Sequence, residues 1–259
     1  MVKTIKETAH KTNVTITCKN CGHQVWGNFC SNCGQGANTH KLNMHFILHD
    51  LQHGLIHFDK GVLYTTKLLL TRPGHTIREF LEGKRVRHFQ PLSFVIVLAT
   101  FYGLLYHYLI FSHIDVTLID PQDDITGASG KIITWMTEHF AFDGLVLIIT
   151  STLVSYVIFK KRKYNLAEHL VLNTYLMGLF LIVSILVFPI VYIFGNALTL
   201  QYGIVQQGFL LVLMCWCYAQ FFDKTSKGKV IGLTVIAFLV ISLVNIAIGY
   251  FAGWIVRQF

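Results

Sequence analysis

Five long apolar stretches constrain this chain more than any other feature of its sequence. A helix needs about 20 apolar residues to cross the hydrocarbon core of a bilayer, and each stretch reaches or approaches that length. With 53% hydrophobic and only 13% charged residues, the chain also lies outside the range of soluble domains. The sequence therefore predicts an all-α membrane protein with a five-span transmembrane helical bundle. The predicted spans are Pro91–Phe111, Phe140–Phe159, Leu166–Phe194, Gly203–Phe222 and Val230–Trp254.

The charges between these stretches predict the orientation of the chain. Ser112–His139 contains five acidic residues against the single base Lys131, whereas the loops at Lys160–Lys163 and at Lys224, Lys227 and Lys229 are basic. Basic loops stay on the cytosolic side of a membrane. We therefore expect a membrane protein with a cytosolic N-terminus and an outer C-terminus. The polar first ten residues lack the apolar core of a signal peptide, so none is predicted.

The chain divides into three predicted regions. Residues 1–38 form a zinc-ribbon head, residues 39–90 form amphipathic, interfacial helices with a basic motif, and residues 91–259 form the five-helix transmembrane domain. Of the 21 Lys and Arg residues, 12 precede Pro91. A basic region beside membrane spans favours anionic lipid head groups as partners over nucleic acid.

Four cysteines in the head form two C-x-x-C-G knuckles, Cys18–Gly22 and Cys30–Gly34. Paired knuckles at this spacing are typical of a tetrahedral zinc site, so Cys18, Cys21, Cys30 and Cys33 are predicted to hold one structural Zn²⁺. Disulfides are the alternative, but a cytosolic thiol pool keeps cysteines reduced. A redox role is a lesser alternative because no βαβ pattern surrounds either knuckle.

The head itself is expected to be a ribbon of short strands from Val14–Thr17 and His23–Trp26, with folding driven by the metal. Four thiolates leave no open coordination position, so this zinc is predicted to support a surface rather than to catalyse a reaction. Gly22–Gln35 contains no Lys or Arg, which disfavours nucleic-acid binding by the ribbon.

A histidine-rich helix is predicted from an N-cap at Asn43 to about Phe58, with Gly61 as its stop. Histidines four residues apart can chelate a metal, which suggests a second site. Each step of four rotates the side chain by about 40°, so the whole set cannot meet at one ion. A solvated face that titrates with pH is the favoured alternative. The histidines concerned are His45, His49, His53 and His57.

A basic motif follows at 71–87. Pro73-Gly74 predicts a turn, Thr76 to Glu79 a capping box and Gly83 the end of a short helix. Its cations, together with an acid and a histidine at the mouth of the third span, suggest a lipid or phosphate head-group site. An ordinary positive-inside anchor is the favoured alternative. The head-group hypothesis concerns Arg72, Arg78, Lys84, Arg85, Arg87, Glu168 and His169.

Several of these motifs resemble, in their order, a bacterial family of zinc-ribbon multi-pass membrane proteins that carries a domain-of-unknown-function label. The resemblance rests on C-x-x-C…F-C-x-x-C-G-Q, Asp59-Lys-Gly61 and P-G-x-T-I-R-E-F-L-x-G-K-R-x-R-H-x-x-P ending at Pro91. It extends from Cys18 to about Phe94, with a weaker echo at Glu168-His169-Leu170. The family implies the same architecture in a bacterial inner membrane, but no activity, substrate or catalytic residue.

Function is predicted less sharply than architecture. No carboxylate or cation lies in the middle of a span, which disfavours an ion or proton pathway, and no catalytic residue or organic cofactor is predicted. The favoured function is a docking or accessory subunit whose cytosolic head binds a protein partner; a homo-oligomer is left open. The alternatives are a lipid-handling or transport protein and a histidine-rich membrane metalloenzyme.

Overall fold

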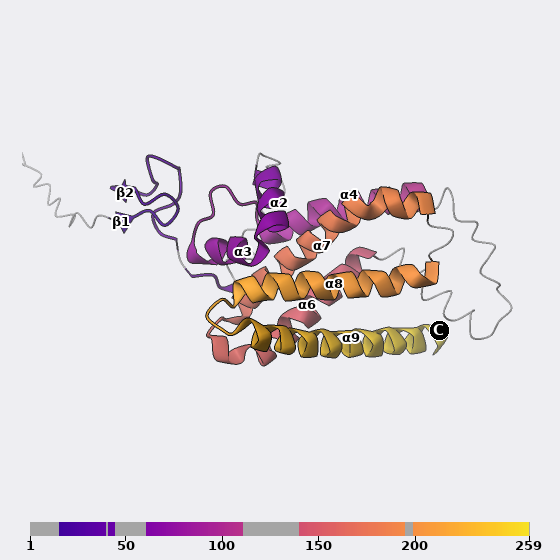
Figure 1. Cartoon of the computed structure of the whole chain (residues 1–259). Helices are drawn as coiled ribbons and strands as arrows, with labels where there is room; N and C mark the ends of the chain where they lie inside the picture. Colours follow the sequence, from indigo (N-terminus) through magenta and orange to yellow (C-terminus); the bar gives the residue numbers. More distant parts are fainter. Residues whose placement is uncertain (1–15, 40, 45–60, 111–139, 195–198, 259) are drawn as a thin grey trace, which may run out of the picture.

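The computed structural model describes residues 16–39, 41–44, 61–110, 140–194 and 199–258, and these are mostly helical. Five long helices run side by side, with two short helices and a small ribbon at one end (Figure 1). The elements are β1 (Ile16–Thr17), β2 (Gln24–Val25), α2 (Gly61–Thr71), α3 (Pro73–Glu82), α4 (Pro91–Ile110), α6 (Phe140–Ile158), the 3₁₀ turn η2 (Lys160–Arg162), α7 (Leu166–Phe194), α8 (Thr199–Phe221) and α9 (Lys227–Gln258).

Helix α7 is the centre of the bundle. It packs against α4 and α6 along its length and also contacts α2, α3 and α8. Leu172, Tyr175 and Leu179 are each completely buried on it, and the helix continues past Pro189 to Phe194. In contrast, α9 packs against α6 and α8 and lies at the edge of the bundle.

Two helical segments of the described chain are long and apolar enough to cross a membrane. Leu166–Ile190 has a mean hydropathy of 2.4 and is 67% buried, whereas Lys227–Ala252 has a mean hydropathy of 2.6 and is 17% buried. Three further apolar segments are shorter: Pro91–Leu105, Phe142–Ile158 and Val205–Phe221. The sequence predicted five spans, and the structure supports two. The high burial of the first is also found in core helices of soluble proteins, whereas the low burial of the second is not.

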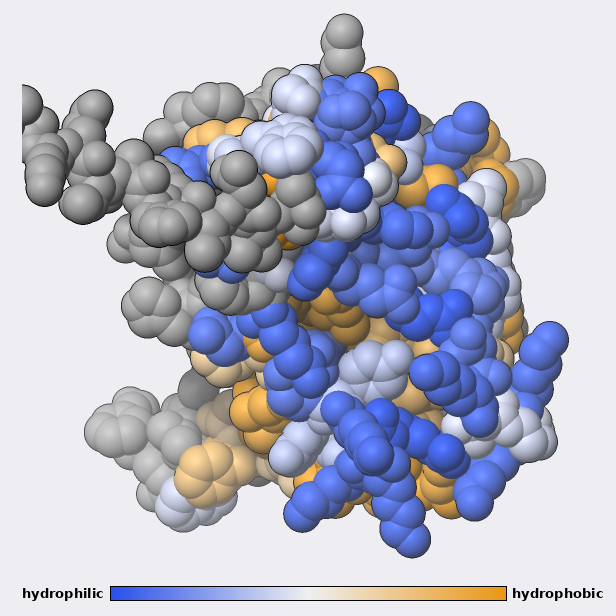
Figure 2. Space-filling model, turned by 90° about the vertical axis from the view of Figure 1, so that its left-hand side faces the viewer, coloured by the Kyte–Doolittle hydropathy of each residue, from blue (hydrophilic) through white to orange (hydrophobic). Residues whose placement is uncertain are grey.

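One end of the bundle is polar. The ribbon, α3, η2 and the turn between α8 and α9 all lie there (Figure 1), and hydrophilic side chains cover much of the described surface of this end (Figure 2). The basic loop Lys160–Lys163 and the lysines Lys224 and Lys227 belong to these turns. The described basic loops are thus collected at the ribbon end of the bundle.

The two short helices begin at a glycine and at a proline. Gly61 begins α2, and the histidine-rich helix that it was predicted to end lies almost entirely outside the described residues. The capping box predicted at Thr76 is wrong, because α3 begins at Pro73 and the Thr76 hydroxyl donates to the Arg72 carbonyl at 2.9 Å. Proline is well suited to the first helical position, where its missing N–H has no intrahelical partner to lose. The stop at Gly83 is confirmed, with φ of 108° in the left-handed region.

Candidate metal centre and polar end

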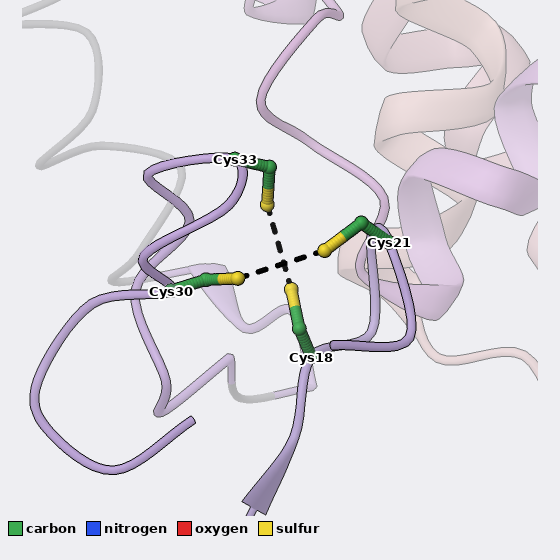
Figure 3. Close-up of side chains that lie close together, drawn as sticks. All are labelled: Cys18, Cys21, Cys30 and Cys33. Carbon is green, nitrogen blue, oxygen red and sulfur yellow. Dashed lines mark hydrogen bonds between the residues drawn. The ribbon is translucent and has the colours of Figure 1, made fainter. Parts of the chain in front are cut away.

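The four head cysteines point toward one another (Figure 3). Their Sγ atoms all lie within 4.8 Å of one another, with Cys18 3.6 Å from Cys33 and Cys21 3.5 Å from Cys30. A tetrahedral metal with sulfur bonds of about 2.3 Å has sulfur–sulfur edges of about 3.8 Å. The distances are far too long for disulfides, and all four are free cysteines. The set therefore fits one metal ion, as the sequence predicted.

The first knuckle is a tight turn closed by two backbone hydrogen bonds. The Gly22 N–H donates to the Cys18 carbonyl at 2.9 Å, and the Cys18 N–H donates to the His23 carbonyl at 2.9 Å. Gly22 has φ of 77°, which a residue with a Cβ rarely adopts. The glycine after the second cysteine is therefore required by the turn.

The second knuckle repeats the first after 12 residues. The Gly34 N–H donates to the Cys30 carbonyl at 2.8 Å, the Cys30 N–H donates to the Gln35 carbonyl at 2.7 Å, and Gly34 has φ of 76°. Strand pairing repeats as well, because the β1–β2 pair in the first half corresponds to the Phe29–Gly36 bridge in the second. Two equivalent half-sites thus face each other across the metal position.

The protein environment gives two thiols different acidities. Burial raises the pKa of Cys18 to about 11, whereas the hydrogen bond from the His23 backbone lowers the pKa of Cys21 to about 6. Metal binding requires both as thiolates. Loading therefore displaces protons, and a closed set of four thiolates supplies structure rather than an open catalytic position.

Arg78, a predicted head-group ligand, closes the end of α8. Its guanidinium donates to the carbonyls of Gln220 at 3.3 Å and Phe221 at 3.2 Å and pairs with Asp223 at 2.7 Å. Only 18% of its side chain is exposed. A cation at a helix C-terminus satisfies carbonyls that have no intrahelical partner, so Arg78 joins α3 to α8.

We expect Arg78→Ala to lower the free energy of unfolding by about 2 kcal/mol, because charge-assisted hydrogen bonds are lost at a largely buried helix end. Arg87→Ala is the matched control, since Arg87 is exposed and has no hydrogen bond or ion pair within the described residues. Thermal unfolding in detergent micelles measures both. Equal stability of the two variants would contradict this role.

Three other cations of the basic motif, unlike Arg87, also have partners among the described residues. Arg72 and Lys84 share the carboxylate of Glu79, at 3.3 and 3.5 Å respectively. The Arg85 guanidinium donates to the Phe80 carbonyl at 3.2 Å and lies 5.5 Å from the centre of the Phe80 ring. The motif therefore binds its own helix α3 and the neighbouring turns.

Glu168 and His169 lie at the start of α7. The Glu168 carboxylate accepts from the Asn165 N–H at 2.7 Å, and the Asn165 side chain accepts from the Glu168 N–H at 2.8 Å. This is a capping box, which the spacing N-x-x-E could have predicted. Lys41 pairs with Glu168 at 3.6 Å, and the Asn165 amide donates to the Leu42 carbonyl at 3.1 Å. These contacts fix the chain after the ribbon to the beginning of α7.

His169 belongs to a buried polar network that sequence reasoning missed. Its Nδ1 lies 3.0 Å from Ser155 Oγ, which accepts from the Asn173 amide at 3.0 Å. Tyr218 donates to Asn173 Oδ1 at 2.8 Å. The network links α6, α7 and α8. Its members are single polar residues in different apolar stretches, and their positions form no recognisable sequence motif.

His88, directly after the basic motif, is buried between the rings of Tyr64 and Phe80. Within the described chain neither ring nitrogen has a partner in hydrogen-bond geometry. Burial lowers the pKa of His88 below its ordinary value of 6.5, and nearby Glu79 opposes that shift. As pH falls below 6.5 the unfolded chain gains a proton that the folded chain does not, so stability is lost on acidification.

We expect His88→Phe to be at least as stable as the wild type at pH 7.5, because it preserves the ring contacts and removes two unsatisfied buried nitrogens. The variant should also lose less stability between pH 6.5 and 5. In this range protonation of the unfolded wild-type histidine lowers the free energy of unfolding by up to about 1.4 kcal/mol per pH unit. Thermal unfolding across this range is the measurement. An unchanged pH slope would show that His88 is not the titrating group.

The proposed second metal site at His45, His49, His53 and His57 lies outside the described residues. Within the described chain, the head cysteines are the group whose ligand atoms converge. Cys215 and Cys217, in α8, are not part of it.

A model of the family described as "Protein of unknown function (DUF3667)" matches residues 59–103. This segment contains α2, α3 and the first part of α4, and with them the whole basic motif. The chain is thus similar to a family of unknown function over this segment, which excludes the four cysteines and the later helices. No curated protein matches the chain, and no solved structure does.

Proposed function

We propose that this chain is an integral protein of the bacterial inner membrane whose zinc ribbon docks a protein partner in the cytosol, as an accessory subunit of a membrane complex. The observation that carries this is the apolar tip of the ribbon. Trp26 and Phe29, on the segment that joins the two knuckles, are 74% and 70% exposed. A structural metal site that holds two aromatic side chains in water is suited to binding rather than to catalysis.

Five spans are proposed from α4, α6, α7, α8 and α9. Large apolar side chains that face outward support this. On α6 they recur every four residues, and each is more than half exposed, which is costly in water and favourable in lipid. Those on α6 are Leu145, Ile149, Leu153 and Val157. Helix α9 supports it further, since a mean hydropathy of 2.6 with 17% burial suits a lipid-facing helix.

The cytosolic placement of the ribbon rests on charge. The polar end of the bundle carries the basic loops, and basic loops face the cytosol. A reducing compartment keeps the four cysteines available as thiolates. Zinc is the proposed metal because a closed set of four thiolates in two knuckles is its usual structural site.

The tip is large enough to anchor a partner. An aromatic side chain buries roughly 150–250 Å² in an interface, and aromatic anchors of this kind contribute about 2 kcal/mol or more on alanine substitution. We therefore expect Trp26→Ala with Phe29→Ala to weaken partner binding by a factor of about 30 or more.

Purification of the intact protein from its host membranes in mild detergent, followed by mass spectrometry, tests the proposal. A stoichiometric protein should accompany the wild type and be absent from the Trp26→Ala, Phe29→Ala double variant and from Cys30→Ser. Ser31→Ala, an exposed change on the same ribbon, is the control and should retain the partner. Recovery of the wild type without a partner would refute the docking function.

A further inference from the structure

Gln35 connects the ribbon to the helical bundle. Its side chain is 6% exposed, and its amide group makes two hydrogen bonds with the turn after α3. Nε2 donates to the Gly83 carbonyl at 2.8 Å, and Oε1 accepts from the Arg85 N–H at 3.2 Å. One amide thus satisfies a backbone acceptor and a backbone donor on either side of Lys84, which fixes this turn in both position and orientation.

The backbone of Gln35 is simultaneously part of the second knuckle. Its carbonyl accepts from the Cys30 N–H at 2.7 Å, so the side chain projects from the turn that aims the Cys30 thiolate at the metal. The ribbon has almost no apolar core of its own, with Cys18, Val25 and Cys30 as its buried cluster. The knuckle, and with it the position of Gln35, depends on the metal.

The remaining contacts between the ribbon and this turn are closely packed around Gly83. A Cβ at Gly83 would lie 2.9 Å from Lys19 Cδ and 3.1 Å from Thr39 Cγ2. Lys19 in turn donates to the Thr39 carbonyl at 2.7 Å, and Gln35 Nε2 also reaches Thr39 Oγ1 at 3.2 Å. Both knuckles therefore contribute to the surface on which the turn rests.

The turn continues into the core of the bundle. The His88 N–H donates to the Arg85 carbonyl at 3.2 Å, and the Phe89 N–H donates to Thr65 Oγ1 at 2.8 Å. The hydroxyl of Tyr175, fully buried on α7, donates to the Phe89 carbonyl at 2.6 Å. Hydrogen bonds along this short segment thus connect the cysteine knuckle to α2 and to the centre of α7.

We propose that Gln35 is a metal-dependent clamp: with the metal bound it holds the turn at 83–85, and loss of the metal releases this turn and frees the ribbon from the bundle. Metal occupancy then governs how the ribbon is presented to a partner. The inference rests on the proposed function only in that the four cysteines hold a metal, and it does not require a partner.

The repeat within the ribbon supplies a matched control. His23 occupies the position in the first knuckle that Gln35 occupies in the second, and its carbonyl accepts from the Cys18 N–H as that of Gln35 does from Cys30. The His23 side chain is exposed and makes no hydrogen bond to α3 or to the turn after it. His23→Ala thus alters the same knuckle position without altering the clamp.

Hydrogen exchange of the full chain in detergent micelles, zinc-loaded and chelator-stripped, tests the clamp. Peptides covering residues 83–89 should exchange about tenfold faster or more once zinc is removed, because the Arg85 and His88 amides lose their protection. Zinc-loaded Gln35→Ala should exchange as fast as the stripped wild type while retaining its zinc. Zinc-loaded His23→Ala should match the zinc-loaded wild type.

Zinc content, measured in the same samples, distinguishes a failure of the clamp from a failure of the metal site. The clamp is overturned if zinc is removed and the exchange rate at 83–89 does not change. It is also overturned if zinc-bound Gln35→Ala exchanges at the wild-type rate. Either result leaves the metal site intact. A wild type that binds no zinc overturns the metal site, and the metal dependence of the clamp fails with it.

Discussion

Replacing Cys30 with serine is expected to reduce the bound metal from one ion per chain to none and to unfold the ribbon. Structural zinc contributes roughly 10–16 kcal/mol to the folding of small knuckle domains, and no other interaction here is of that size. Strands β1 and β2 have two residues each, and the buried cluster beside them is built largely of the cysteines themselves. Without the metal, the chain there cannot bury enough apolar surface to offset its conformational entropy.

Elemental analysis of the purified chain measures the first effect, and limited proteolysis at Lys19 measures the second. Helical circular dichroism should be nearly unchanged, because the long helices lie outside the ribbon. Cys215→Ser is the matched control, since Cys215 lies in α8 and is no ligand. A Cys30→Ser chain that retains a full metal equivalent would show that the cysteines are not the metal site.

The second large effect is expected from Gly74→Ala, at the contact between α3 and α8. A Cβ at this position would overlap the backbone of Cys217 and of Phe221. Backbone atoms inside a packed helix cannot move aside singly, so the two helices must separate. We expect a loss of about 3 kcal/mol in the free energy of unfolding, the upper end of typical overpacking costs. Separation would also displace Arg78 from the end of α8.

Gly103→Ala is the control for this prediction, because a Cβ there meets no atom within 4 Å. Both glycines are helical, so the change in intrinsic helix propensity is similar and only the packing differs. Thermal unfolding in the same detergent compares them. A Gly74→Ala chain as stable as the Gly103→Ala chain would show that α3 and α8 can adjust without cost.

Local patterns in the sequence were sufficient for the ribbon. The spacing of Cys18, Cys21, Cys30 and Cys33 predicted their convergence, because each knuckle is a short turn whose geometry is set by its own residues. The end of α3 at Gly83 was predictable for the same reason. The capping box at Asn165 and Glu168 could also have been predicted from N-x-x-E, since both residues lie in one turn.

Contacts between distant segments were not predictable. Arg78 was predicted to be either a positive-inside anchor or a head-group ligand, and its observed partners are 142 and more residues away at the end of α8. Gly74 was interpreted as part of a turn, and only the approach of α8 reveals why a larger residue is excluded. Gln35 lies directly after the second knuckle, but its hydrogen bonds reach 48 and 50 residues along the chain.

The sequence by itself thus predicted the long apolar helices and the cysteine cluster, because an apolar stretch and a knuckle are each defined by residues that are neighbours in the sequence. The tertiary structure decided which partners most cations of the basic motif have within the chain. A cation can bind lipid, a carboxylate or a helix end with similar chemistry, and the choice depends on which segment lies beside it. For Arg78 that neighbour is α8 and Asp223, and for the turn after α3 it is Gln35 of the metal ribbon.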